Sequence, residues 1–210
     1  MGKKGIIRNI RRGNFAKVLG AMHPGCHQPM SKTALNRYPE IFAAAAAALP
    51  NARRILSFGC SSGEECATLE KYFPNAEIVG ADVNLLSLAK AMRYWSRKIR
   101  FVYATDHTLS RLGGFDAVFC MAVLRNPRKK LNAGRYPFER FEERARFLET
   151  LLRPGGILVI HNSNYRFGDV AHQYAYERIP FFARHDRGLF LPDGITEVDP
   201  DSCLFRRLDS

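Results

Sequence analysis

The stretch of sequence that decides the fold reads Arg54-Ile-Leu-Ser-Phe-Gly-Cys-Ser-Ser-Gly-Glu-Glu65. It predicts a short apolar strand that enters a tight turn and leaves it as a helix beginning with two acids. The small residues Gly59, Ser61 and Gly63 let the backbone approach a ligand closely, and amides at the helix N-terminus point toward it. The stretch therefore predicts a ligand-binding turn, with a turn required only by the fold as the simpler alternative.

Strands and helices alternate along the chain beyond this turn. Short apolar segments predict strands at residues 55–58, 78–81, 101–104, 117–121 and 157–160. Apolar residues at helical spacing predict core-packed helices at residues 64–72, 84–98 and 137–152. Two further strands are expected at 180–184 and 202–207, as an antiparallel pair at one edge. The alternation indicates an α/β fold, a Rossmann-like doubly wound sheet of about seven mostly parallel strands with helices on both faces.

The N-terminal part of the chain is strongly basic. Residues 1–39 contain eight Lys or Arg and no acid, within a net charge of +12. We expect residues 1–33 to form a basic, partly helical arm or lid, and residues 34–210 to form the main domain, which opens with a helix from about residue 34 to Pro50. A basic arm favours an anionic partner, such as nucleic acid, an acidic small molecule or an anionic membrane surface; the alternative is a solvated face.

The composition excludes several classes of protein. Five scattered cysteines, an odd number, argue for reduced thiols rather than a disulfide framework. No apolar stretch is long enough to span a membrane, and residues 1–20 carry no apolar region typical of a secretory signal. We therefore expect a soluble, cytoplasmic protein. His23, Cys26 and His27 are of metal-ligand type, but no partner cluster accompanies them, so no metal is predicted.

Two alternative functions, dinucleotide binding and serine hydrolysis, fit the turn poorly. Dinucleotide binding requires G-x-G-x-x-G, whereas Ser61 replaces the second glycine and Glu64 the third, and two carboxylates would meet the pyrophosphate. Residues 59–63 also match the nucleophile elbow G-x-S-x-G, which makes a serine hydrolase an alternative. Such an enzyme would use Ser61 as nucleophile with Asp116 and His161, although only one strand precedes the elbow and no oxyanion loop of HGGG type is present.

S-adenosylmethionine fits the turn better. This ligand has no phosphate and carries an ammonium, a sulfonium and one carboxylate. Backbone amides at the turn can donate hydrogen bonds to the carboxylate, while the neighbouring acids Glu64 and Glu65 suit the ammonium. Asp82 ends the second predicted strand, where an acid can accept both ribose hydroxyls. A single acid after a strand is common by chance. The ordered series, with the glycine turn after the first predicted strand and Asp82 after the second, predicts a site for this methyl donor.

From about residue 54 to 165, the chain resembles the class I S-adenosylmethionine-dependent methyltransferases, and residues 58–65 and 115–120 look most like the chemotaxis receptor methyltransferases. It departs from most class I enzymes at Ser57, where they have an acid, and at Ser61, where they have glycine. The resemblance implies a cofactor site with the methionine portion near Gly59, Cys60, Ser61 and Gly63, ribose and adenine near Asp82 and Val83, the adenine edge near Asp106 and His107, and the sulfonium near Cys120 and Met121.

An acceptor is expected beyond the carboxyl ends of the strands, next to the methyl group. The polar residues that follow the fourth and fifth strands are candidates for binding it: Arg125, Asn126, Asn162, Asn164, Tyr165 and Arg166. Either arginine can hold an acidic group bidentately, while Asn162 and Asn164 are alternatively loop-capping residues. His161 is the candidate general base for a hydroxyl acceptor.

The sequence therefore predicts an S-adenosylmethionine-dependent methyltransferase that acts on a small molecule or glycan, expected to be anionic, with O-methylation preferred. In-line methyl transfer depends mainly on placing the nucleophile correctly. An RNA methyltransferase that uses the basic arm is an alternative, weakened by the absence of a recognisable RNA-binding module. A serine hydrolase with Ser61 as nucleophile is the second alternative.

Overall fold

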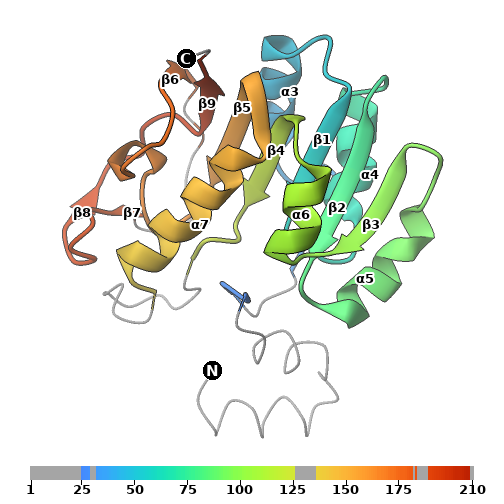
Figure 1. The fold of residues 1–210 in the computed structure, drawn as a ribbon, viewed down its shortest axis with the longest axis horizontal. Helices are drawn as coiled ribbons and strands as arrows, with labels where there is room; N and C mark the ends of the chain where they lie inside the picture. The colour runs from blue at the N-terminus through green and yellow to red at the C-terminus, as the bar shows by residue number, and fades with distance from the viewer. Residues whose placement is uncertain (1–24, 29–31, 126–135, 182, 184–188, 209–210) are drawn as a thin grey trace, which may run out of the picture.

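The computed structural model describes residues 25–28, 32–125, 136–181, 183 and 189–208. Its centre is a seven-stranded sheet with the order β3-β2-β1-β4-β5-β9-β6 (Figure 1). Strand β9 is antiparallel to both of its neighbours, and the pairs from β3 to β5 are all parallel. The strands are β1 (Arg54–Phe58), β2 (Glu77–Asp82), β3 (Ile99–Tyr103), β4 (Phe115–Met121), β5 (Leu152–His161), β6 (Tyr176–Ile179) and β9 (Leu204–Arg207); β7 (Leu189–Phe190) and β8 (Glu197–Val198) form a separate pair.

Helices cover both faces of the sheet. One apolar core contains side chains of α3, α4 and α5, and the other contains side chains of α6 and α7. The helices are α3 (Pro39–Ala48), α4 (Glu64–Tyr72), α5 (Leu85–Ala91), α6 (Asp106–Leu112) and α7 (Phe138–Thr150), with short 3-10 helices η1 (Met92–Tyr94) and η3 (Phe167–Asp169). The predicted α/β Rossmann-like fold is confirmed. The expected helical arm falls mostly on residues 1–24, which lie outside the described residues.

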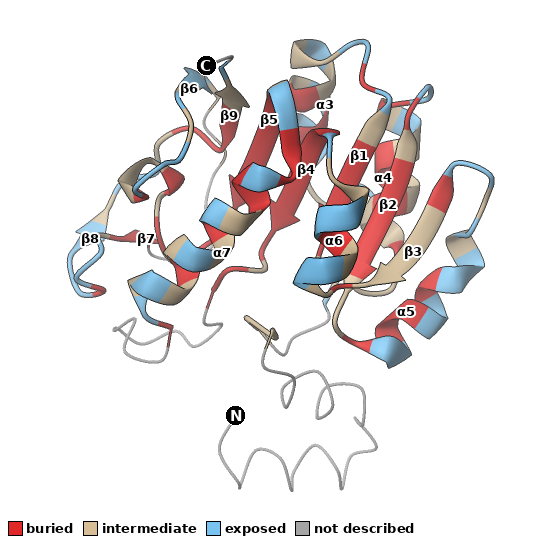
Figure 2. Ribbon diagram, viewed as in Figure 1, coloured by how far each residue is buried: buried red, intermediate tan, exposed pale blue. Residues whose placement is uncertain are grey.

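The central strands are apolar because helices bury them on both sides. Strand β1 has four of its five residues buried and all seven residues of β4 are buried (Figure 2). The order of the strands reverses at β1. The chain continues from β1 to β2 and β3 on one side, and β4 and β5 lie on the other side of β1. In a doubly wound sheet this reversal opens a crevice at the carboxyl ends of the strands, which is where a ligand binds.

Two predicted segments differ from the structure. The helix expected over residues 84–98 ends earlier, because Trp95 adopts an extended backbone (φ −58°, ψ 134°). The Ser96 hydroxyl then accepts the amides of Lys98 and Ile99 and turns the chain into β3. The antiparallel edge pair is confirmed, but its first strand is Tyr176–Ile179 rather than 180–184.

Helix α3 also begins later than expected, at Pro39 instead of about residue 34. Proline is favoured at the first helical position because its missing amide would have no helical partner there. Residues 32–38 therefore precede the helix as an irregular segment that turns at residues 35–38, with Asn36 in the left-handed region. No helix in the part of the chain that the structure describes is long and apolar enough to cross a membrane.

Candidate cofactor and acceptor site

The turn after β1 has the backbone geometry that its small residues allow. Gly59 (φ 77°), Ser61 (φ 50°) and Gly63 (φ 89°) all lie in the left-handed region. A Cβ atom on Gly59 would lie 2.5 Å from a methyl carbon of Val123, so no side chain fits there without displacing Val123. The amides of Gly59 and Cys60 both donate to the carbonyl of Ala81, at 2.7 and 3.1 Å, which ties the turn to the end of β2.

Asp82 is fixed at the end of β2 by backbone amides. Its Oδ2 accepts the amide of Ser61 at 2.8 Å, and its Oδ1 accepts the amide of Asn84 at 2.8 Å. Burial raises the pKa of the Asp82 carboxyl, and these amide hydrogen bonds oppose the rise. A carboxylate oxygen has a second lone pair, so each oxygen can still accept a hydroxyl. Asp82 is therefore held ready to accept a diol.

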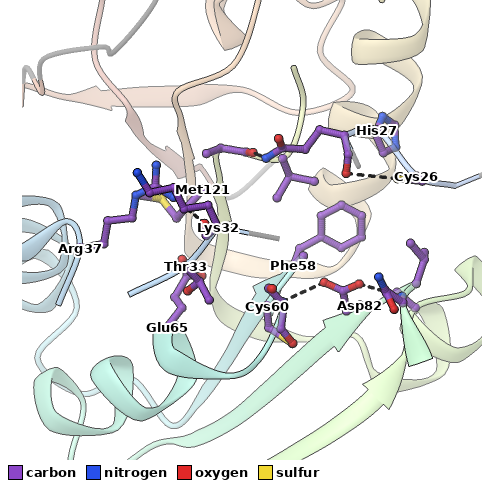
Figure 3. Close-up of a pocket in the computed structure, with 18 of the residues that line it drawn as sticks. Cys26, His27, Lys32, Thr33, Arg37, Phe58, Cys60, Glu65, Asp82 and Met121 are labelled. Carbon is purple, nitrogen blue, oxygen red and sulfur yellow. Dashed lines mark hydrogen bonds between the residues drawn. The ribbon is translucent and has the colours of Figure 1, made fainter. Parts of the chain in front are cut away.

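A single pocket joins this turn to Asp82 at the carboxyl ends of β1, β2 and β4 (Figure 3). Its floor is formed by the turn and by the ends of the three strands. Its other wall is formed by two stretches that precede α3, residues 25–28 and 32–38, which we call the lid segments. The residues that line it include Cys26, His27, Gln28, Lys32, Arg37, Tyr38, Gly59, Cys60, Ser61, Glu65, Asp82, Val83, Asn84, Met121, Ala122 and Val123.

Hydrogen bonds hold the first lid segment against α7 and the end of β4. A 2.7 Å hydrogen bond joins His27 Nδ1 to the Tyr136 hydroxyl, and Arg140 donates to the Cys26 carbonyl at 3.0 Å. The Gln28 side chain donates to the Ala122 carbonyl. Burial, together with Arg140 and Arg144, lowers the pKa of His27 to about 3. His27 is therefore a neutral polar group at the pocket wall.

The second lid segment is attached to α4. The amide of Asn36 donates to the Thr68 hydroxyl at 2.9 Å, and the Tyr72 hydroxyl donates to the Asn36 side chain at 3.0 Å. These contacts place Arg37 and Lys32 at the end of the pocket that also holds Met121 and Glu65 (Figure 3). The pocket therefore has two cations and one acid at its end opposite Asp82.

Of the two acids that open α4, Glu65 faces the pocket. Its Oε1 accepts the Ser57 hydroxyl at 2.7 Å. Burial raises the pKa of Glu65 to about 7, and the Ser57 hydrogen bond and the charge of Arg37 limit the rise. Glu64 instead pairs with Arg93 and accepts the Ser62 hydroxyl at 2.9 Å, outside the pocket lining. Both acids were expected to suit the ammonium, and only Glu65 lines the pocket. The absence of an acid at Ser57 is the sequence signal that a neighbouring residue supplies the carboxylate.

The other predicted cofactor residues divide into two groups. Gly59, Cys60, Ser61, Asp82, Val83 and Met121 line the pocket. The pocket lining does not include Gly63, Asp106, His107 or Cys120. Gly63 packs at the start of α4, where a Cβ atom would lie 3.1 Å from Tyr94 and Phe101. Asp106 accepts a hydrogen bond from Arg144 at 2.6 Å, and Cys120 is buried in the core.

The predicted acceptor residues lie behind the pocket rather than along it. The ring of His161 is buried edge to face against Tyr38, with 5.0 Å between ring centroids. Asn162 donates to the Tyr38 hydroxyl at 3.4 Å; Tyr38 lines the pocket, and neither His161 nor Asn162 does. Arg166 holds Asp169 with two hydrogen bonds, at 2.9 and 2.8 Å, which uses the fork that was assigned to an acidic acceptor.

The remaining members of that set have structural contacts. The Tyr165 hydroxyl donates to the Tyr136 carbonyl at 2.8 Å, and the Asn164 amide donates to the Leu124 carbonyl at 3.0 Å. Arg125 is buried next to the end of β4. Asn126 lies outside the described residues. Tyr38 and Arg37 were not predicted at the pocket, and His27 was included only in the expected lid, because contacts between the N-terminal segment and the sheet leave no periodic pattern in the sequence.

The geometry contradicts the hydrolase triad. Asp116 accepts the amides of Arg53 and Arg54, at 2.6 and 2.8 Å, at the start of β1. Ser61 follows the other end of the same strand, roughly 17 Å away at about 3.3 Å per residue. Asp116 therefore cannot act with Ser61. Among the described residues, no group of three or more His, Cys, Asp or Glu side chains is arranged to hold a metal ion.

Comparisons with known proteins give two partial sequence matches. Trans-aconitate 2-methyltransferase of Deinococcus radiodurans is 30% identical over 110 residues, which are 51% of this chain and 36% of that protein. Ribosomal RNA small subunit methyltransferase C of Hahella chejuensis is 40% identical over 68 residues, 31% of this chain and 20% of that protein. The chain thus covers only about a third or less of the length of these relatives.

Among solved structures, the amino pentose methyltransferase CalS10 of Micromonospora echinaspora superimposes with a TM-score of 0.49 at 17% identity, over 96% of this chain and 83% of that one. The family described as "Methyltransferase domain" matches residues 56–160, half of the chain. The matched residues run from β1 through the turn and Asp82 to the end of β5. The chain therefore belongs to the methyltransferase domain family, within the class I S-adenosylmethionine-dependent methyltransferases.

Proposed function

We propose that the protein is a methyltransferase that binds S-adenosylmethionine across the crevice. The observation that carries the proposal is that two half-buried acids with different partners, Asp82 and Glu65, line one pocket on either side of the Gly59–Ser61 turn. Asp82 is placed to accept the ribose hydroxyls, with Val83 beside the adenine. Glu65 is placed to accept the ammonium of the methionine portion.

The charges at the Glu65 end support this orientation of the donor. The methionine portion is zwitterionic, with one ammonium and one carboxylate. The pocket offers Glu65 for the ammonium and the cations Arg37 and Lys32 for the carboxylate. Hydrogen bonds to charged groups contribute about 1.5–3 kcal/mol each, so this end favours a zwitterion over a purely anionic ligand.

The chain's own residues bind and orient the reactants. Bound S-adenosylmethionine supplies a methyl group that its sulfonium already activates. The turn fixes the reacting end beside Met121, and the lid segments cover the pocket and limit the access of water. Most of the rate is then expected from alignment of the acceptor with the methyl carbon.

For the acceptor, we propose a small molecule or glycan with an anionic group, methylated preferably on oxygen. The sequence likeness to a methyltransferase named for a carboxylic acid supports an anionic acceptor. The resemblance to chemotaxis receptor methyltransferases extends only to the cofactor turn and supports no receptor substrate. The general-base role of His161 stays a prediction, because its ring lies behind Tyr38, whereas His27 lines the pocket.

We further propose residues 1–33 as an arm that acts as a lid and residues 34–210 as the donor-binding domain of a cytoplasmic enzyme. Contacts of residues 26–28 with Tyr136, Arg140 and Ala122 support the lid. RNA methylation through the basic arm stays an alternative, and most of that arm lies outside the described residues. Calorimetric titration with S-adenosylhomocysteine tests donor binding: micromolar affinity that Asp82→Asn weakens supports the proposal, and an absence of binding rejects it.

A further inference from the structure

Exposed apolar side chains gather on one short segment of the surface. Of the seven large apolar residues that are exposed among the described residues, four lie between residues 85 and 95. They are Leu85, Leu86, Met92 and Trp95, with exposed fractions of 65%, 41%, 52% and 60%. We call these four residues the α5 surface. Large exposed apolar side chains are usually scattered singly, so their concentration on one segment indicates an interaction site.

The helix does not need these side chains for its own packing. The opposite side of α5 packs on the sheet through Ser87, Leu88 and Ala91, which are buried. The residues of the α5 surface are exposed instead, in α5, in η1 and directly after it, and Figure 2 shows exposed stretches along α5. The segment therefore exposes large apolar side chains in addition to the ones that it buries against the sheet.

Cations accompany the apolar groups. The segment from residue 85 to 98 contains four cations, Lys90, Arg93, Arg97 and Lys98, and no acid, and all four are exposed. Arg93 pairs with Glu64, and Lys98 donates to the Pro74 carbonyl at 2.6 Å. Within the described part of the chain, Lys90 and Arg97 form no ion pair. Glu70 accepts the Ser96 hydroxyl at 3.4 Å, so two acids, Glu64 and Glu70, contact a segment that holds four cations, and the region around the α5 surface stays positive.

This combination points to one kind of partner. Exposed Leu, Met and Trp side chains flanked by Lys and Arg are suited to the interface of an anionic lipid bilayer, where apolar groups enter the acyl boundary and cations meet the headgroups. A second copy of this chain would bring cations against cations. Nucleic acid would use Trp95 and the arginines but would leave Leu85 and Met92 without a role. We propose that the α5 surface docks the protein peripherally on an anionic membrane.

The location of the surface relates it to the pocket. Asn84, which caps α5 by accepting the amides of Leu86 and Ser87, lines the pocket beside Asp82 and Val83. Leu85 follows directly in the chain. Docking through the α5 surface would therefore hold the Asp82 end of the pocket close to the lipid headgroups.

Trp95 provides a direct test, because it is the only tryptophan in the chain. Its fluorescence is recorded with vesicles of phosphatidylcholine alone and with vesicles that also contain phosphatidylglycerol. We expect a blue shift and protection from iodide only with the anionic vesicles, both reversed by salt. An unchanged emission spectrum with both kinds of vesicle would overturn the proposal.

Two variants separate this surface from general basicity. Lys90→Glu/Arg97→Glu should weaken vesicle binding by at least roughly 30-fold, at about fivefold for each cation lost. Arg111→Glu/Arg146→Glu makes the same change of charge at exposed positions of α6 and α7, on the other face of the sheet, and should leave binding intact. Equal losses in the two variants would contradict docking through α5.

Apolar contact and competing partners are tested separately. Leu85→Ser/Met92→Ser leaves the charge and the reporter in place and should abolish the blue shift. An unaltered blue shift in this variant, or binding to an RNA oligonucleotide in preference to anionic vesicles, would reject the membrane as the partner. Binding of S-adenosylhomocysteine by the same variants shows that they are folded. Failure of vesicle binding leaves the proposed methyltransferase activity untouched.

Discussion

The hydroxyl of Ser57 donates a 2.7 Å hydrogen bond to the carboxylate of Glu65. Most class I enzymes carry an acid at the position of Ser57, so the carboxylate in this chain comes from the first turn of α4 instead of from β1. Because burial raises the pKa of Glu65 to about 7, its charge changes within the physiological range. The end of the pocket at which we propose the methionine portion to bind is thus sensitive to pH through Glu65.

Donor affinity should depend on pH through Glu65. The ammonium of the donor prefers ionised Glu65, so affinity should be highest above pH 7 and fall as the pH drops below 7. Glu65→Gln should weaken S-adenosylhomocysteine binding about tenfold or more at pH 8, since it removes a charged hydrogen bond, and should flatten the profile. Titration calorimetry at pH 6 and pH 8 measures both effects.

Glu64→Gln is the matched control, because Glu64 starts the same helix but pairs with Arg93. It should leave the pH profile unchanged. If Glu64→Gln alters donor binding as much as Glu65→Gln does, Glu65 is not the ammonium acceptor.

The stability of the donor-free protein should depend on pH in the direction opposite to that of donor affinity. The pKa of Glu65 is raised above its ordinary value of 4.5, so the folded state holds the proton more tightly than the unfolded state. Its contribution to stability is present below about pH 4.5 and is lost as the pH rises through about 7. Without donor, Glu65→Gln should therefore melt at a higher temperature than the wild type at pH 8, and the gain should shrink toward pH 5. A lower melting temperature at pH 8 would contradict the desolvation of this carboxyl.

Ser61 should be dispensable as a nucleophile. Asp116 lies at the far end of β1, so nothing activates Ser61 through that acid, and a fluorophosphonate probe should not label it. Ser61→Gly should keep donor binding and stability, since glycine adopts a φ of 50° without strain. Labelling of the wild type that disappears in Ser61→Ala would support the serine hydrolase hypothesis instead.

Kinetic measurements should show whether His161 acts as the general base. If His161 is the general base for a hydroxyl, His161→Ala should lower kcat by roughly two to four orders of magnitude and keep donor affinity. If His161 only positions Tyr38, the variant should lose melting temperature rather than turnover, and Tyr38→Phe should reproduce little of the effect. Single-turnover rates and melting temperatures are measured together.

His27→Gln is the companion variant, since His27 lines the pocket with a pKa of about 3. It should raise the acceptor KM without changing the pH profile between pH 6 and pH 8. A pH-rate profile that loses its acid limb in this variant would instead make His27 the titrating base.

The sheet and the turn could be predicted from the sequence because their signals are local and periodic. Strands β1 to β5 are apolar runs, and α4 begins and ends at Glu64 and Tyr72 as predicted. Asp82 was placed at the pocket because an acid at the end of the second strand must lie beside the turn after the first. Parallel order makes that contact a consequence of topology.

The acceptor side could not be predicted, because it depends on contacts between distant segments. Tyr38 covers His161 although 123 positions separate them in the sequence, and His27 reaches Tyr136 across 109. Arg166 was expected in the pocket, but Asp169, three residues later, satisfies its guanidinium locally. Glu64 and Glu65 are adjacent and chemically alike. Which of them faces the pocket depends on how α4 is rotated about its axis, and the sequence does not give this.

The most direct test of the central claim, that Asp82 and the turn bind S-adenosylmethionine, is the melting temperature with S-adenosylhomocysteine. The wild type should melt at a higher temperature with this ligand and at an unchanged temperature with NAD, as expected of a ligand selective for the native state. Asp82→Asn should lose most of that shift, while Asp106→Asn, whose carboxylate pairs with Arg144 outside the pocket, should retain it. An equal shift with NAD, or a full shift in Asp82→Asn, would contradict the account.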